Sequence, residues 1–194
     1  MMLPVLLVLG LSQPVAAGQT AQPRVDYAAL FSRGAEWQPW YDAIRAQQAT
    51  WRRVAGQVSP PPALVERFRA AGGNLRLLVV AEAACSDSMQ SLPHIAALAD
   101  RAGVPMRIVN KADGAAAMAS RRTPDGRTAT PTVILLRDGQ DVAAWVERPD
   151  ALQAWFLANG HLSRAERLER KTAWYQWDRG GSTLAEIVAL AERR

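Results

Sequence analysis

The sequence predicts an α/β protein built on a mixed four-stranded sheet with helices on both faces. Residues 74–160 alternate short β-rich apolar runs with helical patterns in the order β-α-β-α-β-β-α. A strand–helix–strand unit requires a crossover and therefore parallel pairing, whereas an Asp-Gly pair at 138–139 is typical of a tight antiparallel hairpin. These two signals together predict a sheet of mixed direction.

The elements of this predicted core follow from local signals. Each strand is a short apolar run, and the central helix ends at Gly103. Pro149 stands where proline is favoured, in the first turn of the closing helix, ahead of the apolar Leu152, Trp155 and Phe156. The predicted strands are 75–80, 104–109, 132–136 and 142–146, and the predicted helices before Pro149 are 86–101 and 114–121.

Helices are also expected on both sides of the core. Residues 25–73 are predicted to be an N-terminal helical extension. It consists of a helical stretch 25–58 with a break near 32–34, in which apolar residues recur at helical spacing and form a buried face, a stop at 59–62 and a further helix 63–71. Residues 161–194 are predicted to form two C-terminal helices packed on the core, 163–177 and 183–194. The apolar stripe of the extension consists of Trp37, Trp40, Tyr41, Ile44 and Trp51.

The N-terminus has the features of a targeting segment. Residues 3–11 are an apolar run too short to span a bilayer, followed by small residues at signal-peptidase spacing. We therefore expect residues 1–17 to be a signal peptide and 18–24 a linker, so that the protein is exported, to the periplasm, without a membrane anchor after processing. Because no Lys or Arg precedes the apolar run, a cytoplasmic protein is the alternative.

The charge distribution argues against a nucleic-acid partner. The formal net charge is +5, but the basic residues are spread along the chain and have acidic neighbours. No cofactor or metal is expected either, because His94 and His161 lie on separate predicted helices and no set of residues has zinc-ligand spacing.

The chemistry is expected at Cys85, the only cysteine of the chain. It lies where the first strand ends and a helix begins, and unpaired N–H groups at a helix start stabilise a thiolate. Pro93 follows inside the helical pattern, where a proline implies a kink. Far along the chain, Thr130-Pro131 opens a strand, a position that suits a cis peptide bond.

This combination resembles the thioredoxin superfamily. The strand, Cys85-x-x-Ser88 in place of Cys-x-x-Cys, the helix proline and Thr-Pro-Thr-Val-Ile-Leu-Leu-Arg-Asp-Gly at 130–139 carry the resemblance. A closer resemblance is to bacterial single-cysteine thioredoxin family proteins with a Trp-Cys-Gly-Asp motif, although Ala84 and Ser86 replace its Trp and Gly. The tail from 173 to 187 also resembles that group. The resemblance implies a thioredoxin-like fold, with Thr130 and Pro131 beside Cys85.

The motif Cys85-Ser86-Asp87-Ser88 permits a monothiol cycle. Ser88 stands where a second thiol would resolve a mixed disulfide, and a hydroxyl cannot do so, although it could donate a hydrogen bond to the thiolate. Asp87 could accept a proton or cap the helix. We therefore expect Ser86, Asp87, Ser88, Thr130 and Pro131 to shape a site around Cys85.

Three hypotheses follow. The first is a thiol–disulfide exchange protein acting through Cys85, with protein thiols or disulfides, or a small thiol such as glutathione, as partner. The second is a non-catalytic binding module that kept the peptide groove and lost redox turnover. The third is a structural role for Cys85 in a disulfide-linked dimer.

Overall fold

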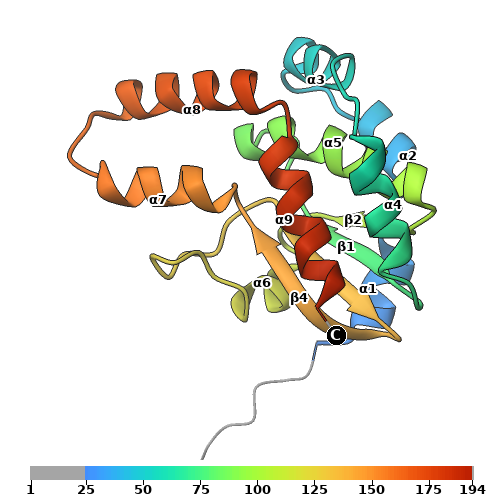
Figure 1. The fold of residues 1–194 in the computed structure, drawn as a ribbon. Coiled ribbons are helices and arrows are strands. Elements are labelled where there is room, and N and C mark those ends of the chain that lie inside the picture. Colours follow the sequence, from blue (N-terminus) through green and yellow to red (C-terminus); the bar gives the residue numbers. More distant parts are fainter. Residues whose placement is uncertain (1–24, 194) are drawn as a thin grey trace, which may run out of the picture.

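The computed structural model describes residues 25–193, so the expected signal peptide and linker lie outside the described residues. The fold of the described part is shown in Figure 1. Its elements are α1 (Tyr27–Arg33), α2 (Trp37–Asp42), α3 (Gln48–Ala55), α4 (Pro62–Ala70), β1 (Arg76–Val80), α5 (Ser86–Ala102), β2 (Met106–Val109), α6 (Ala115–Ala119), β3 (Thr132–Arg137), β4 (Gln140–Val146), α7 (Asp150–Ala158), α8 (Arg164–Asp178) and α9 (Gly181–Glu192).

The strands form one mixed sheet in the order β2-β1-β3-β4. β1 pairs with β2 in parallel, and β1–β3 and β3–β4 are antiparallel. Asp138 and Gly139, which join β3 to β4, both have positive φ (51° and 80°), as the two central residues of a type I′ hairpin turn require. The predicted mixed sheet and its hairpin are confirmed.

Alternation along β1 separates two apolar clusters, one on each face of the sheet. Leu77 and Val79 pack toward the side covered by α3, α4, α5 and α9, and Leu78 and Val80 toward the side covered by α1 and α6 (Figure 1). All four side chains are fully buried. Burial on both faces explains why β1 reads as a continuous apolar run rather than an alternating one.

The N-terminal extension has the predicted break near 32–34 and a second interruption, after Asp42, that was not predicted. It therefore contains three helices before α4. Ala35 leaves the helical path because its backbone exchanges two hydrogen bonds with Ile108, of 2.9 and 2.8 Å. Helical periodicity in the sequence cannot show this contact, since its partner is 73 positions away (108 − 35 = 73).

The predicted aromatic stripe is a packing cluster. Trp51 is 1% exposed, and the rings of Trp37, Trp40 and Tyr41 surround it with centroids 5.5 to 6.3 Å from its own. Its indole N–H donates to the carbonyl oxygen of Ala83 at 3.1 Å. The extension therefore supports the loop that leads into Cys85.

The C-terminal helices lie on two different parts of the molecule. α9 packs against α4, α5 and β4, whereas α7 and α8 run side by side and project away from the sheet (Figure 1). Ser163 and Glu166 form the predicted capping box at the start of α8. α9 begins at Gly181, two residues before the predicted start, because Asp178 accepts hydrogen bonds from Ser182. None of the helices within residues 25–193 is long and apolar enough to cross a bilayer.

Candidate active site

Cys85 lies at the junction predicted for it, between β1 and α5. It is the N-cap residue of α5, with extended backbone (φ −77°, ψ 121°), and its side chain is half-buried. The side chain does not cap the helix, so it accepts no hydrogen bond from the first-turn N–H groups. Unpaired N–H groups at a helix start favour negative charge near them.

The thiol faces the segment that opens β3. Cys85 Sγ donates to the carbonyl oxygen of Thr130 at 3.1 Å, and the peptide bond between Thr130 and Pro131 is cis. The fold thus places these two predicted site residues beside Cys85, across 45 positions of sequence. The hydrogen bond to Thr130 needs the neutral thiol, so exchange chemistry requires that it break.

Asp87 is the centre of a buried cluster of charged groups. Its carboxylate accepts hydrogen bonds from Lys171 Nζ at 2.9 Å and from the hydroxyl of Tyr175 at 2.9 Å, and it pairs with Arg148 at 3.5 Å. Asp87 is 5% exposed. It therefore neither caps α5 nor faces the thiol freely; instead it connects the start of α5 to α8.

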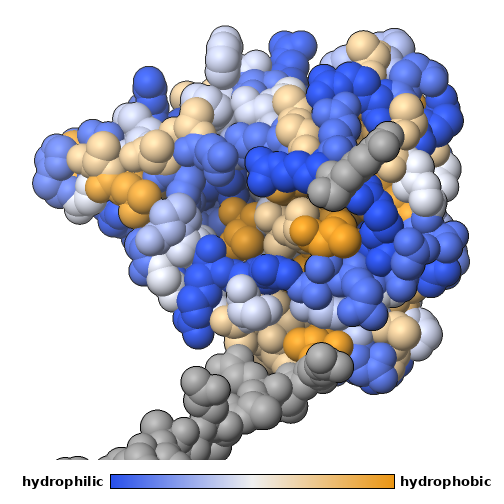
Figure 2. All heavy atoms as spheres, turned by 60° about the horizontal axis from the view of Figure 1, so that its bottom comes forward, coloured by the Kyte–Doolittle hydropathy of each residue, from blue (hydrophilic) through white to orange (hydrophobic). Residues whose placement is uncertain are grey.

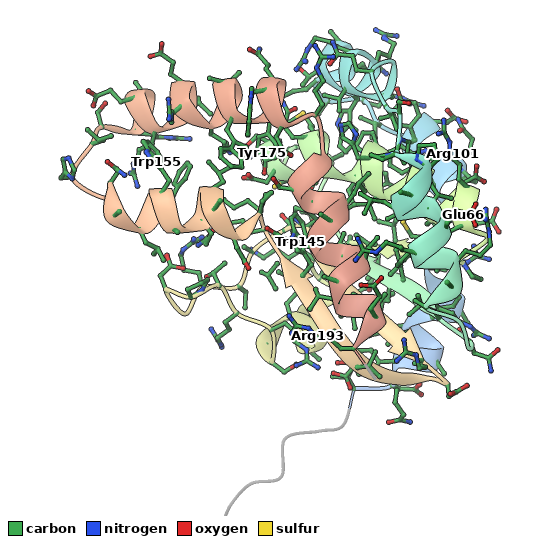
Figure 3. The ribbon with its side chains drawn as sticks, viewed as in Figure 1. Glu66, Arg101, Trp145, Trp155, Tyr175 and Arg193 are labelled. Carbon is green, nitrogen blue, oxygen red and sulfur yellow. The ribbon has the colours of Figure 1, made fainter. Side chains whose placement is uncertain are left out.

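The same contacts explain the titration of Tyr175, which Figure 3 labels near the C-terminal end of α8. Burial raises the pKa of Tyr175 well above its ordinary value, and the neighbouring charge of Asp87 raises it further. Tyr175 therefore stays protonated and remains a hydrogen-bond donor to Asp87.

Two further ion pairs continue this cluster toward the molecular surface. Arg148 also bonds Glu147, which is 6% exposed and pairs with Arg127 at 3.1 Å. The guanidinium of Arg148 lies 4.1 Å from the ring centroid of Phe156 on α7, within cation–π distance. The cluster thus links α5, α7, α8 and the end of β4.

The remaining predicted site residues lie on α5. Ser86 Oγ accepts a hydrogen bond from Lys171 Nζ at 2.7 Å. Ser88 is fully buried, and its hydroxyl has no partner among the described residues; the hydrogen bond to Cys85 considered from the sequence is absent there. Pro93 lies inside α5 and is buried.

His94 belongs to a different part of the fold. It is buried against Gly180 at the start of α9, and burial lowers its pKa although the charge of Asp178 opposes this shift. Within residues 25–193, no group of three His, Cys, Asp or Glu side chains could hold a metal ion.

Sequence reasoning did not identify Lys171, Tyr175 or Arg148 as part of the site. One signal was available for Lys171: the chain has 23 basic residues, and only this residue and Lys111 are lysines. Lysine presents a compact ammonium that suits a buried contact with both a carboxylate and a hydroxyl. No feature of the sequence around Arg148 indicates that this residue belongs to the site.

Comparison with known proteins shows what the chain is similar to. It is 21% identical to a protein of unknown function from Pseudomonas aeruginosa, with a TM-score of 0.66 over 87% of this chain and 98% of that one. It is 22% identical to an HIV epitope-scaffold, with a TM-score of 0.69 over 88% and 99% of the two chains. No curated protein matches.

A family model described as thioredoxin matches residues 34–168. This match extends well before residue 74 and covers the sheet, Cys85 and most of the flanking helices. The predicted thioredoxin-like fold with additional helices is confirmed. The chain belongs to the thioredoxin family.

Proposed function

We propose that the protein carries out thiol–disulfide exchange through Cys85 alone. The observation that carries this proposal is the position of Cys85 at the start of α5. A helix start stabilises a thiolate, and the half-buried side chain is within reach of a partner.

The exchange occurs in two steps. The Cys85 thiolate attacks one sulfur of a disulfide; the new S–S bond forms as the old one breaks, and the second sulfur leaves as a thiolate that takes a proton from solvent. An external thiolate then attacks the partner's sulfur in this mixed disulfide and releases Cys85. No internal thiol can perform this second step, because Cys85 is the only cysteine and residue 88 is serine.

Trapping of the mixed disulfide tests the proposal. Purified protein incubated with a small disulfide should gain one half-disulfide in mass at Cys85, and an added thiol should remove it. Cys85→Ser should abolish both, along with any thiol-dependent reduction of the disulfide. Wild-type protein that gains no mass at any concentration while the unfolded chain does would contradict the proposal.

Ser88→Cys supplies a sharper variant. Ser88 is fully buried one turn along α5, where a second thiol can approach Cys85. We expect this variant to form an internal disulfide and to stop accumulating the mixed disulfide. A variant that still accumulates the mixed disulfide would mean that residue 88 does not face Cys85.

A second candidate function is a binding module without turnover. The hydrogen bond from Cys85 to Thr130 favours it, because that bond stabilises an unreactive neutral thiol.

The two candidates predict different rates of Cys85 alkylation. Alkylation of folded protein near neutral pH should be faster than that of the unfolded chain if Cys85 is a nucleophile, and no faster if the protein only binds. A partner protein that still binds the Cys85→Ser variant in a pull-down would support the binding module.

Export remains a proposal that rests on the sequence of residues 1–17. A fusion of residues 1–24 to a reporter that is active only outside the cytoplasm tests it. Activity of the fusion supports export, and its absence favours a cytoplasmic protein.

A further inference from the structure

A basic cavity of about 410 Å³ adjoins the Cys85 loop, between α7, α8 and the segment that precedes β3. Its volume lies in the range of small-molecule sites. Figure 2 shows the projecting part formed by α7 and α8 at the left, with hydrophilic residues around a few apolar ones. Asp125 is the one acid of the cavity wall, which carries five basic side chains: Arg127, Arg148, Arg164, Arg167 and Lys171.

The positive charge of the cavity is only partly compensated. Arg127, Arg148 and Lys171 are paired with the acidic residues described above. Arg164 and Arg167 form no ion pair with any residue in 25–193. The cavity therefore attracts anions, and two guanidinium groups are free to bind them.

Buried polar atoms on the cavity wall also lack partners. Arg148 Nε and Gln153 Oε1 are buried without a hydrogen bond among the described residues, and both side chains are more than nine-tenths buried (7% and 5% exposed). Arg167 Nε is also buried without a hydrogen-bond partner among these residues, on a side chain that is only half-buried. Unpaired buried donors and acceptors are costly, and a ligand that bonds them removes this cost.

These atoms specify the chemistry of the ligand. The two guanidinium N–H groups require an acceptor such as a carboxylate, and Gln153 Oε1 requires a donor such as an ammonium or amide N–H. A molecule built from amino acids carries both, whereas inorganic phosphate at neutral pH offers mainly acceptors. The cavity therefore fits a small acidic peptide better than a simple anion.

The cavity reaches the residue next to the nucleophile. Ser86, which follows Cys85 directly, lines it and is hydrogen-bonded to Lys171. We infer that this cavity binds the carboxylates of a small acidic thiol, of which glutathione is the representative, and presents its sulfur to Cys85. The inference rests on the proposed exchange function: glutathione disulfide would form the mixed disulfide with Cys85 and release glutathione, and free glutathione would resolve it.

Binding is tested with S-methylglutathione, which has no free thiol and cannot exchange. Calorimetric titration of wild-type protein and of Cys85→Ser should give equal affinities, which weaken as salt is added. The double variant Arg164→Gln/Arg167→Gln should bind about tenfold more weakly, because it loses charge-assisted hydrogen bonds. Arg53→Gln, an exposed arginine on α3 away from the cavity, is the matched control and should bind as wild type does.

Failure of binding would overturn the inference. It would be equally overturned if the double variant bound as tightly as wild type, or if inorganic phosphate bound as tightly as S-methylglutathione. Circular dichroism of the double variant checks that it is folded.

A rate comparison separates this inference from the proposed function. Mixed-disulfide formation should be fastest with anionic glutathione disulfide, slower with neutral bis(2-hydroxyethyl) disulfide and slowest with cationic cystamine. The double variant Arg164→Gln/Arg167→Gln should no longer show this order of reaction rates. If Cys85 reacts with all three without preference, the inference fails and exchange stands. If S-methylglutathione binds but no disulfide reacts, exchange fails, and with it the presentation of sulfur to Cys85.

Discussion

The buried carboxylate of Asp87 offers a quantitative test of how α8 is held beside Cys85. Asp87→Asn keeps the size of the side chain and removes its charge. Asp87, Lys171 and Arg148 are 5%, 8% and 7% exposed, so solvent screens their interaction little. Removal of one partner from a buried ion pair typically costs about 3–5 kcal/mol.

The structure narrows this range. Lys171 keeps its hydrogen bond to Ser86, and Arg148 keeps its ion pair with Glu147, so only Lys171 is left without a carboxylate. Tyr175 retains the amide oxygen as an acceptor. We therefore expect Asp87→Asn to lower the free energy of unfolding by about 3 kcal/mol, the lower end of the range.

Urea unfolding measures this loss as a lower midpoint at unchanged slope. Asp100→Asn, at the exposed end of the same helix, is the control and should change stability by less than about 0.5 kcal/mol. Lys171→Met should rescue part of the loss, because the doubly substituted protein no longer buries the charge of Lys171 without its carboxylate. The double-mutant cycle should show a coupling of at least about 1 kcal/mol.

Two results would refute this reasoning. A loss below about 1 kcal/mol in Asp87→Asn would mean that the cluster does not hold α8 in place. Strict additivity of Asp87→Asn and Lys171→Met would mean that these two side chains do not interact in solution.

Two further predictions concern the packing of α9 against α5. Gly180→Ala should cost about 2–4 kcal/mol in urea unfolding, because φ is +79° and the added Cβ would lie 2.4 Å from the ring of His94. Gly103→Ala is the control: φ is +72° and no atom lies within 4 Å of the added Cβ, so it should cost only about 1 kcal/mol. Equal losses of stability in the two variants would contradict a collision between the Cβ at position 180 and His94. Burial lowers the pKa of His94 below its ordinary 6.5, so the unfolded chain binds the proton more readily than the folded protein does. The contribution of neutral His94 to the free energy of unfolding is therefore complete above pH 6.5 and is lost as the pH falls through its lowered pKa in the folded protein. His94→Leu should therefore show a smaller fall in urea midpoint between about pH 7.5 and about pH 5 than wild type, and an equal fall would contradict the assignment.

Much of the fold could be predicted because its signals are local. The continuous apolar runs 75–80 and 132–136 and the Asp-Gly turn correspond closely to β1, β3 and the hairpin. The position of Cys85 at a helix start followed from the same patterns, because a strand that ends immediately before a helical pattern leaves few alternatives for the residue between them. The thioredoxin motif supplied the expectation that Thr130 would lie opposite.

The differences concern where helices begin and end. The break near 32–34 was predicted, and hydrogen bonds between Ala35 and the backbone of β2 accompany it. The interruption after Asp42, where Gln47 has a left-handed backbone (φ 51°), and the early start of α9, where Asp178 accepts hydrogen bonds from Ser182, were not predicted. Helical periodicity does not show where tertiary contacts and local side-chain hydrogen bonds override helical propensity.

The sequence by itself determined the mixed sheet, the helix start at Cys85 and the absence of a second thiol. Only the tertiary structure decided that Asp87 joins Lys171 and Tyr175, which are 84 and 88 positions away (171 − 87 = 84; 175 − 87 = 88). It also brought Arg148, Arg167 and other basic residues around one cavity that Ser86, the residue after Cys85, also lines. Periodicity reports which face of a helix is buried, but the partner that this face meets depends on how distant helices pack.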